Sequence, residues 1–175
     1  MRDTMRKTEM QTFWWIAGFT TIAALLFLWI GTRIPSESVY DPATVPDPFF
    51  IFRSNLLLQM GVILSGLFSI GLAPLFYIAF NFLMLGSTVQ AVAKETSLSF
   101  AWSLVWPHGL IEIPGMICSA AISFFLLLVL YRRVRYKEPV PLRFVAKLIS
   151  LNVLMIGIAA LVETYITPQV VRLFV

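Results

Sequence analysis

The chain has 175 residues; 59% of them are hydrophobic, only 13% are charged, and the mean hydropathy is +0.86. A soluble domain of this size usually carries about a quarter charged residues, so the composition excludes a soluble protein and predicts an integral membrane protein. The formal net charge of +4 is then a sign of membrane orientation rather than of nucleic-acid binding. The single cysteine, Cys118, excludes an internal disulfide and a thiolate metal cluster.

The first predicted transmembrane helix covers residues 13–31. Its uncharged core of 18 residues, from Phe13 to Ile30, is long for a signal peptide, and no small-residue cleavage motif follows it. The next segment, residues 34–52, has prolines at positions 35, 42, 46 and 48. We therefore expect a retained first helix, followed by a proline-rich loop that lies irregularly over the outer face of the membrane.

A run of 40 uncharged residues, from 54 to 93, follows this loop. As one helix it would span roughly 60 Å, about twice the hydrocarbon thickness of a bilayer. The turn residues from Gly71 to Pro74 interrupt it near its midpoint, so it is predicted to be a helical hairpin, 54–72 and 75–93. A fourth span, 107–131, begins with Pro107 in its first turn, and a fifth, 148–166, ends before Pro168.

Together these segments predict an all-α bundle of five transmembrane helices that forms a single membrane domain over residues 1–175. With the N-terminus in the cytoplasm, nine of the 13 lysines and arginines lie on the cytoplasmic side, as the positive-inside rule requires. The same topology places the C-terminus outside, and we expect the protein in the cytoplasmic (inner) membrane of a bacterium.

Most of the cytoplasmic charge belongs to one predicted loop, 132–147. Its basic residues are Arg132, Arg133, Arg135, Lys137, Arg143 and Lys147. We interpret the loop as an orientation signal in contact with anionic lipid. A docking site for a cytoplasmic partner is the alternative.

Two carboxylates, Glu112 and Glu163, lie inside the predicted spans, each about one turn from the outer end. An ionised carboxylate without a partner is costly in a membrane, so such residues are usually paired, neutral or next to water. His108 lies four residues before Glu112 and shares its helix face. From the depth of each residue we expect one polar network in the outer leaflet, with Asn81 near mid-depth. Its predicted members are Asn55, Gln59, Asn81, Gln90, His108, Glu112 and Glu163.

Small residues continue these polar faces. Helices in membranes approach one another closely where their facing side chains are small. One such row follows the polar start of the second span, and another continues the His108 face of the fourth. The residues predicted to pack in this way are Gly61, Ser65, Ser69, Gly115 and Ser119.

Three residues are candidates for chemistry: His108, Glu112 and Glu163. The first interpretation is structural, with His108 orienting the end of its helix and the two carboxylates in a hydrogen-bonded network. A zinc site is chemically allowed, because zinc accepts imidazole and carboxylate ligands beside an open position. The spacing is a weak signal, however, since the chain has no H-E-x-x-H motif, and G-x-S-x-G and phosphate-binding glycine loops are absent as well. We assign no catalytic residue, metal or cofactor from the sequence, and zinc is the one cofactor left open.

Four segments carry a family resemblance. In chain order they are I-F-R-S-N-L at 51–56, N-F-L-M-L-G at 81–86, W-P-H-G-L-I-E-I-P-G at 106–115 and V-E-T-Y-I-T-P at 162–168. Together they resemble the stage II sporulation protein M family of bacterial polytopic membrane proteins, from about residue 50 to 168, with the first span as the variable part. P-H-G-x-x-E is the most specific element. Two departures bear on the subfamily: Phe82 where members often have glycine, and Ser54 where a second asparagine is common.

The resemblance implies a membrane scaffold for peptidoglycan-degrading partners during sporulation. Short members of the family also accompany circular bacteriocins, with a part in maturation, secretion or self-protection beside an ATPase partner. The resemblance supplies no catalytic mechanism.

We therefore predict a non-catalytic scaffold or accessory protein that recruits partners for envelope remodelling, or for the maturation or export of a membrane-active peptide and protection from it. Expected partners are the lipid bilayer and other membrane proteins, among them a cytoplasmic ATPase or peptidoglycan-acting proteins; self-association is a further option, and nucleic acid is not expected. Two alternatives stay open. One is an intramembrane peptidase or peptide cyclase that uses His108, Glu112 or Glu163, with or without zinc, and the other is a proton-coupled transporter component.

Overall fold

The computed structural model describes residues 2–35 and 47–174, and all regular structure in them is helical. Five helices are long and apolar enough to cross a membrane, which confirms the predicted all-α, five-span fold. In chain order the elements are α1 (Arg2–Gly31), α2 (Pro48–Phe68), α3 (Leu72–Glu95), α4 (Leu98–Tyr136), α5 (Leu142–Leu161), the π-helical turn η1 (Val162–Ile166) and α6 (Thr167–Val171). Most of the predicted proline-rich loop lies outside the described residues, and its last part, from Pro48 onward, is the start of α2.

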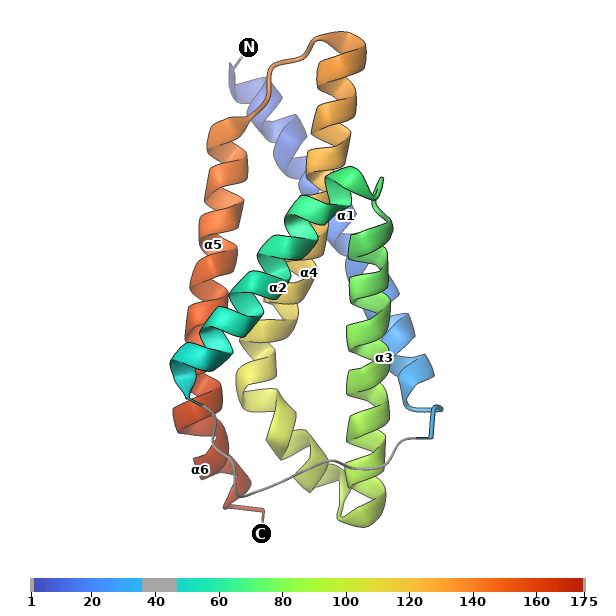
Figure 1. Cartoon of the computed structure of the whole chain (residues 1–175), viewed down its shortest axis with the longest axis vertical. Helices are drawn as coiled ribbons and strands as arrows, with labels where there is room; N and C mark the ends of the chain where they lie inside the picture. Colours follow the sequence, from blue (N-terminus) through green and yellow to red (C-terminus); the bar gives the residue numbers. More distant parts are fainter. Residues whose placement is uncertain (1, 36–46, 175) are drawn as a thin grey trace.

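The longest helix, α4, begins at Leu98, whereas the predicted span began at Pro107. The side chain of Ser97 caps this start by accepting a hydrogen bond from Phe100 N at 3.1 Å. Pro107 and Pro114 therefore lie inside the helix rather than in its first turn. A proline inside a helix removes a backbone donor and clashes with the carbonyl four residues earlier. Accordingly, α4 bends in its first half (Figure 1).

The turn between α2 and α3 consists of Ser69, Ile70 and Gly71 and so begins before the predicted turn. Ile70 has φ 52° and Gly71 has φ 86°, in the left-handed region that glycine adopts freely and β-branched residues avoid. Ser69 Oγ accepts a hydrogen bond from Ala73 N at 2.9 Å. Pro74 lies in the first turn of α3, where no intrahelical donor is needed.

Helix α4 is the centre of the bundle and packs against each of the other four long helices (Figure 1). One apolar cluster joins α1, α2, α4 and α5 around Phe13 and Phe125, whose rings meet edge to face with centroids 6.1 Å apart. A second cluster joins α1, α2, α3 and α4 around Ile78 and Phe82. Lipid tails are as apolar as these side chains, so close packing and polar bonds, rather than burial from water, hold the helices together.

Glycines allow the close crossing of α1 and α3. A Cβ atom at Gly31 would collide with the backbone oxygen of Leu83, and one at Gly86 would collide with that of Leu28. The sequence prediction did not include either glycine. It did include Gly61, which is exposed and makes no close approach: among the described residues, no atom lies within 4 Å of a Cβ atom placed there.

The remaining predicted small residues have different surroundings. Ser65 and Ser119 donate hydrogen bonds to carbonyl groups of their own helices. Gly115 lies where α4 faces both α2 and α5, and a Cβ atom there would be in ordinary van der Waals contact. Helix α2 approaches α4 closely at Gly66, which the sequence prediction did not include and where a Cβ atom would collide with Ser123 Oγ.

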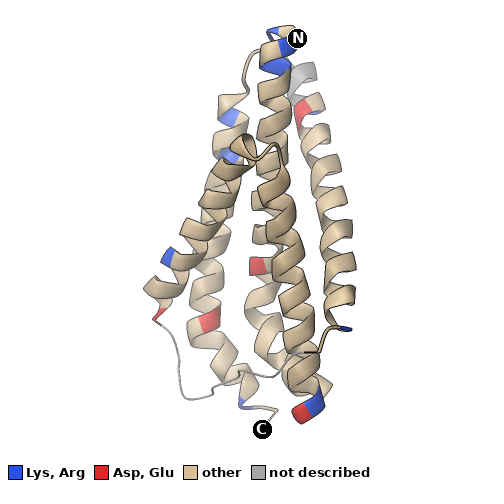
Figure 2. Cartoon of the chain, turned by 45° about the vertical axis from the view of Figure 1, so that its right-hand side comes forward, with Lys and Arg blue, Asp and Glu red and all other residues tan. Residues whose placement is uncertain are grey.

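Most charged residues lie toward the two ends of the bundle (Figure 2). The N-terminus and the connection between α4 and α5 lie at one end, and α6, the C-terminus and the connection between α3 and α4 lie at the other (Figure 1). Glu112 on α4 and Glu163 on η1 are therefore unusual, because they lie in apolar stretches away from the charged ends of their helices. The side chains around these two carboxylates form the candidate site.

Candidate functional site

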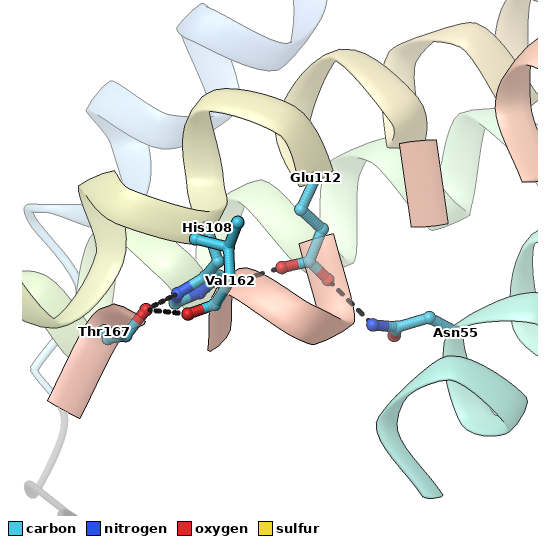
Figure 3. Close-up of polar contacts among 5 residues, drawn as sticks. All are labelled: Asn55, His108, Glu112, Val162 and Thr167. Carbon is cyan, nitrogen blue, oxygen red and sulfur yellow. Dashed lines mark hydrogen bonds and ion pairs between the residues drawn. The ribbon is translucent and has the colours of Figure 1, made fainter. Parts of the chain in front are cut away.

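Glu112 is the central residue of the site, because each of its carboxylate oxygens faces a different partner (Figure 3). Asn55 Nδ2, from α2, donates a hydrogen bond to Glu112 Oε1 at 3.2 Å. On the other side, Glu112 Oε2 lies 3.8 Å from His108 Nε2, one turn earlier on α4. This second distance is too long for a hydrogen bond. The side chains of His108 and Glu112 keep 16% and 23% of their surface exposed, so neither is completely buried inside the bundle.

His108 is oriented by Thr167, which belongs to α6. His108 Nδ1 lies 3.2 Å from Thr167 Oγ1, and Thr167 Oγ1 donates a hydrogen bond to the carbonyl oxygen of Val162 at 3.2 Å (Figure 3). A hydroxyl group has one proton, and that proton is directed to Val162. The neutral tautomer that satisfies both contacts has Nδ1–H of His108 donating to Thr167, which leaves the lone pair on Nε2, the nitrogen that faces Glu112.

A π-helical turn brings Glu163 and Thr167 to this place. Pro168 has no backbone N–H and its ring clashes with the carbonyl of Thr164 in a regular α-helix. The helix widens over Val162–Ile166, and the N–H of Thr167 donates to Val162 O, five residues earlier. Turns of this kind occur mostly singly and often at functional sites.

His108, Glu112 and Glu163 are the three residues that the sequence singled out for chemistry, and the structure brings them together. Each offers one ligand atom, and these atoms all lie within 4.8 Å of one another. All three side chains are half-buried. Among the described residues, no lysine or arginine forms an ion pair with either carboxylate. The arrangement can therefore accept a proton or a cation, and these three residues are the ones that could hold a metal.

A pocket of about 210 Å³ lies beside His108 and Glu112, between α3 and α4, and Glu163 does not line it. His108, Glu112 and Asn81 supply its polar lining, and apolar side chains such as Phe82 and Ile113 supply the rest. Asn81 Nδ2 donates to Tyr77 O of its own helix at 2.8 Å, so Asn81 lines the pocket without bonding to the carboxylates. The pocket leaves room for water or a small molecule beside His108 and Glu112.

A second polar contact lies near Gly115 and includes a residue that the sequence prediction missed. Asn152 of α5 is 0% exposed, and its Nδ2 donates to Gln59 Oε1 at 3.0 Å and to Gly115 O at 2.7 Å. This amide joins α2, α4 and α5. An asparagine in the middle of the fifth predicted span was the available signal for it. Thr167 had no such signal, because it lies just after the predicted fifth span, 148–166, at a position where a threonine is unremarkable.

The residues that were predicted to form one polar network therefore form two separate groups in the structure. Asn55, His108, Glu112 and Glu163 form one group, whereas Gln59 bonds to Asn152 in the other. Asn81 takes a place beside the pocket. Gln90 is half-buried on α3, and within the described part of the chain no hydrogen bond links it to either group.

Comparison with known proteins supports the family resemblance that the four sequence segments carry. The family model described as stage II sporulation protein M matches residues 19–168, so it begins within α1 rather than near residue 50. A protein of Methanocaldococcus jannaschii, described as uncharacterized, is 29% identical over 135 residues, which are 72% of this chain and 76% of that protein. No solved structure matches the chain. Because the family model covers most of the chain, including every residue of the His108, Glu112 and Glu163 group, the protein is a membrane protein that belongs to the stage II sporulation protein M family.

Proposed function

We propose that the protein is a non-catalytic scaffold of a bacterial cytoplasmic membrane, with its N-terminus in the cytoplasm, that recruits partner proteins. The task that it serves is envelope remodelling, or the maturation or export of a membrane-active peptide and protection from it. One observation carries the proposal: the polar side chains of the site direct their hydrogen bonds to neighbouring helices of the same chain. A site built in this way holds helices in fixed positions.

These bonds reach across most of the bundle. Asn55 to Glu112 joins α2 to α4, His108 with Thr167 joins α4 to α6, and Asn152 joins α5 to both α2 and α4. An interhelical hydrogen bond in a membrane contributes about 0.6 kcal/mol on average and up to about 1.7 kcal/mol. Together they amount to a few kcal/mol, which is enough to keep one arrangement of the helices dominant and to present constant surfaces to a partner.

The connection between α4 and α5 is the surface that best suits a cytoplasmic partner or anionic lipid. Helix α4 continues to Tyr136, past the predicted end of its span at residue 131. Arg133, Arg135 and Lys137 are exposed there. Basic residues next to a membrane contribute about 1 kcal/mol each to the attraction of anionic lipid headgroups. In the proposed orientation this segment lies at the cytoplasmic surface.

The test compares tagged variants in a host that lacks its own copy of the gene. Membranes are cross-linked and solubilised in mild detergent, the tagged chain is isolated, and its partners are identified by mass spectrometry. In Glu112→Gln the side-chain oxygen still accepts from Asn55, so we expect the same partners and full complementation of the deletion phenotype. Replacement of Arg133, Arg135 and Lys137 by glutamine should lower the recovery of cytoplasmic partners several-fold. Gln90→Ala serves as the matched control.

One result would contradict the scaffold. If Glu112→Gln abolishes complementation while its folding, abundance and partners remain those of the wild type, the carboxylate itself does chemistry. The same result would favour the second candidate, an intramembrane peptidase or peptide cyclase in which Glu112 or Glu163 activates water or accepts a proton. The observation that supports this candidate is the convergence of His108, Glu112 and Glu163 beside a pocket of about 210 Å³.

A further inference from the structure

His108, Glu112 and Glu163 each offer one ligand atom, and these atoms lie within 4.8 Å of one another. In the tautomer in which Nδ1–H donates to Thr167, His108 Nε2 is an acceptor, and it faces Glu112 Oε2 at 3.8 Å. Atoms of this kind repel one another unless a proton or a cation lies among them. The 3.8 Å between His108 Nε2 and Glu112 Oε2 is too long for a direct hydrogen bond. The space between the three atoms therefore suits a positively charged occupant.

His108 and Glu112, both on α4, each make a hydrogen bond through the side-chain atom that would not bind a metal, as metal ligands usually do. His108 donates Nδ1–H to Thr167, which leaves Nε2 free, and Glu112 accepts from Asn55 at Oε1, which leaves Oε2 free (Figure 3). Metal-binding histidines almost always donate their other ring N–H to a fixed acceptor, and metal-binding carboxylates accept further hydrogen bonds. Here both supports come from other helices, so the free atoms of His108 and Glu112 are aimed before any occupant arrives.

Charge gives an independent reason for a cation. The site contains two carboxyl groups, and among the described residues no lysine or arginine forms an ion pair with Glu112 or Glu163. In a bilayer an uncompensated charge is costly. One divalent cation compensates both carboxylates at once, whereas without a cation each carboxyl group must keep its own proton to be neutral.

We propose that His108, Glu112 and Glu163 bind one divalent cation of the zinc class, with a coordination position left open toward the pocket. Imidazole with carboxylate is a ligand set that suits zinc, and three protein ligands beside an open position are typical of zinc sites that also bind water or a substrate. Calcium and magnesium favour six or more oxygen ligands or retained water, which a set containing an imidazole does not supply. The proposal goes beyond the scaffold function and does not depend on it.

The geometry also predicts a movement. Zinc ligand atoms lie about 2.0–2.2 Å from the ion, so two of them are closer to each other than the 4.8 Å within which the three atoms now lie. Binding therefore brings the ligand atoms closer together, and Glu163 is the ligand that moves toward the two preset atoms on α4. Glu163 lies on η1, next to the bond between Thr167 and Val162, so binding should draw the α5–α6 segment toward α4 and stiffen it.

The first experiment measures metal binding by the purified full-length chain. Protein in detergent is stripped with a chelator, its affinity tag is removed, and it is titrated with Zn²⁺ and separately with Co²⁺, whose visible spectrum reports a tetrahedral site. We expect one ion per chain, with Zn²⁺ unaffected by a large excess of Mg²⁺ or Ca²⁺. His108→Ala and Glu163→Gln should weaken binding by at least about 10-fold, and Thr167→Val by about 10- to 100-fold through loss of the support behind His108.

Two controls identify the site. Gln90→Ala leaves the three ligands intact, and Cys118→Ser removes the one thiol of the chain; both should bind like the wild type. Bound Zn²⁺ should also raise the midpoint of thermal unfolding in wild type and controls, because a ligand of the folded state stabilises it, and this rise should be absent in Glu163→Gln.

Two outcomes would overturn the proposal. One is wild-type protein that shows no saturable binding of Zn²⁺ or Co²⁺, a result that requires no variant to fold. The other is monodisperse, helical Glu163→Gln and Thr167→Val proteins that bind as tightly as the wild type. Either outcome leaves the scaffold function untouched, since that function is judged by partner recovery and complementation.

Discussion

Substitution of Gly86 by alanine tests the packing of α1 on α3. A Cβ atom at this position would collide with the backbone oxygen of Leu28, and it would also lie 3.0 Å from Gly31 Cα and from Thr32 N. All three are backbone atoms of α1 and its end, so no side-chain rotation relieves the collision. The two helices must separate, and overpacking of this kind costs about 1–3 kcal/mol.

The matched control is Gly18→Ala. Gly18 lies inside α1 as Gly86 lies inside α3, but a Cβ atom there would meet nothing within 4 Å. Alanine in place of glycine inside a helix gains about 0.5–1 kcal/mol from backbone entropy. This gain is common to both variants, so their difference isolates the collision. We expect Gly18→Ala to be slightly more stable than wild type, and Gly86→Ala to be less stable than Gly18→Ala by about 1–3 kcal/mol.

The assay is reversible unfolding in mixed micelles with increasing SDS, followed by circular dichroism. Gly31→Ala is the partner variant, because its Cβ atom would collide with Leu83 O at the same crossing. Once the helices have separated for one alanine, the second adds little, so the double variant Gly31→Ala/Gly86→Ala should cost less than the sum of the two. Equal stability of Gly86→Ala and Gly18→Ala would show that α1 and α3 are not in this close contact.

Three further predictions concern other parts of the bundle. Asn152→Leu and Gln59→Leu should each destabilise the protein, and a double-mutant cycle should give a coupling of about 0.6–1.7 kcal/mol; additive effects would mean that the two amides do not bond. Ile70→Gly should stabilise the protein by about 1 kcal/mol in the same SDS assay, because it relieves a β-branched residue at φ 52°, and a loss of stability would argue against that backbone conformation. In a cysteine-free background, a membrane-impermeant maleimide should label Arg172→Cys in intact cells but Glu138→Cys only after lysis, and the reverse pattern would refute the positive-inside topology.

The fold was predictable because the information for it is local. Long uncharged runs and turn residues identify membrane helices one at a time, and the number and order of the helices follow from them. Their ends were less predictable. Pro107 has the character of a helix start, yet Ser97 caps α4 a few turns earlier, and a proline inside a helix is tolerated when neighbouring groups satisfy the freed carbonyl.

The sequence predicted which residues form the candidate site, but not which of them bond to one another. Polar residues are easily recognised within apolar spans, so the sequence alone indicates His108, Glu112 and Glu163. Which residue bonds to which depends on helix rotation and crossing, and these are set by contacts such as Gly66 against Ser123 that no periodicity reveals. For this reason the sequence prediction grouped Gln59 with the carboxylates, whereas in the structure Gln59 accepts a hydrogen bond from Asn152.

The π-helical turn shows how a distant feature of the sequence acts on the site. Pro168 was predicted only to end the last span, because a proline cannot continue the hydrogen-bonding pattern of a helix. In the structure the helix continues but widens into a π-helical turn before the proline. In this turn the hydroxyl group of Thr167 donates a hydrogen bond to the carbonyl oxygen of Val162. That bond makes Thr167 an acceptor for His108 and thereby turns Nε2 toward Glu112. The orientation of the one histidine in the chain thus depends on a proline far away in sequence, which physically links the V-E-T-Y-I-T-P segment at 162–168 to the P-H-G-x-x-E element.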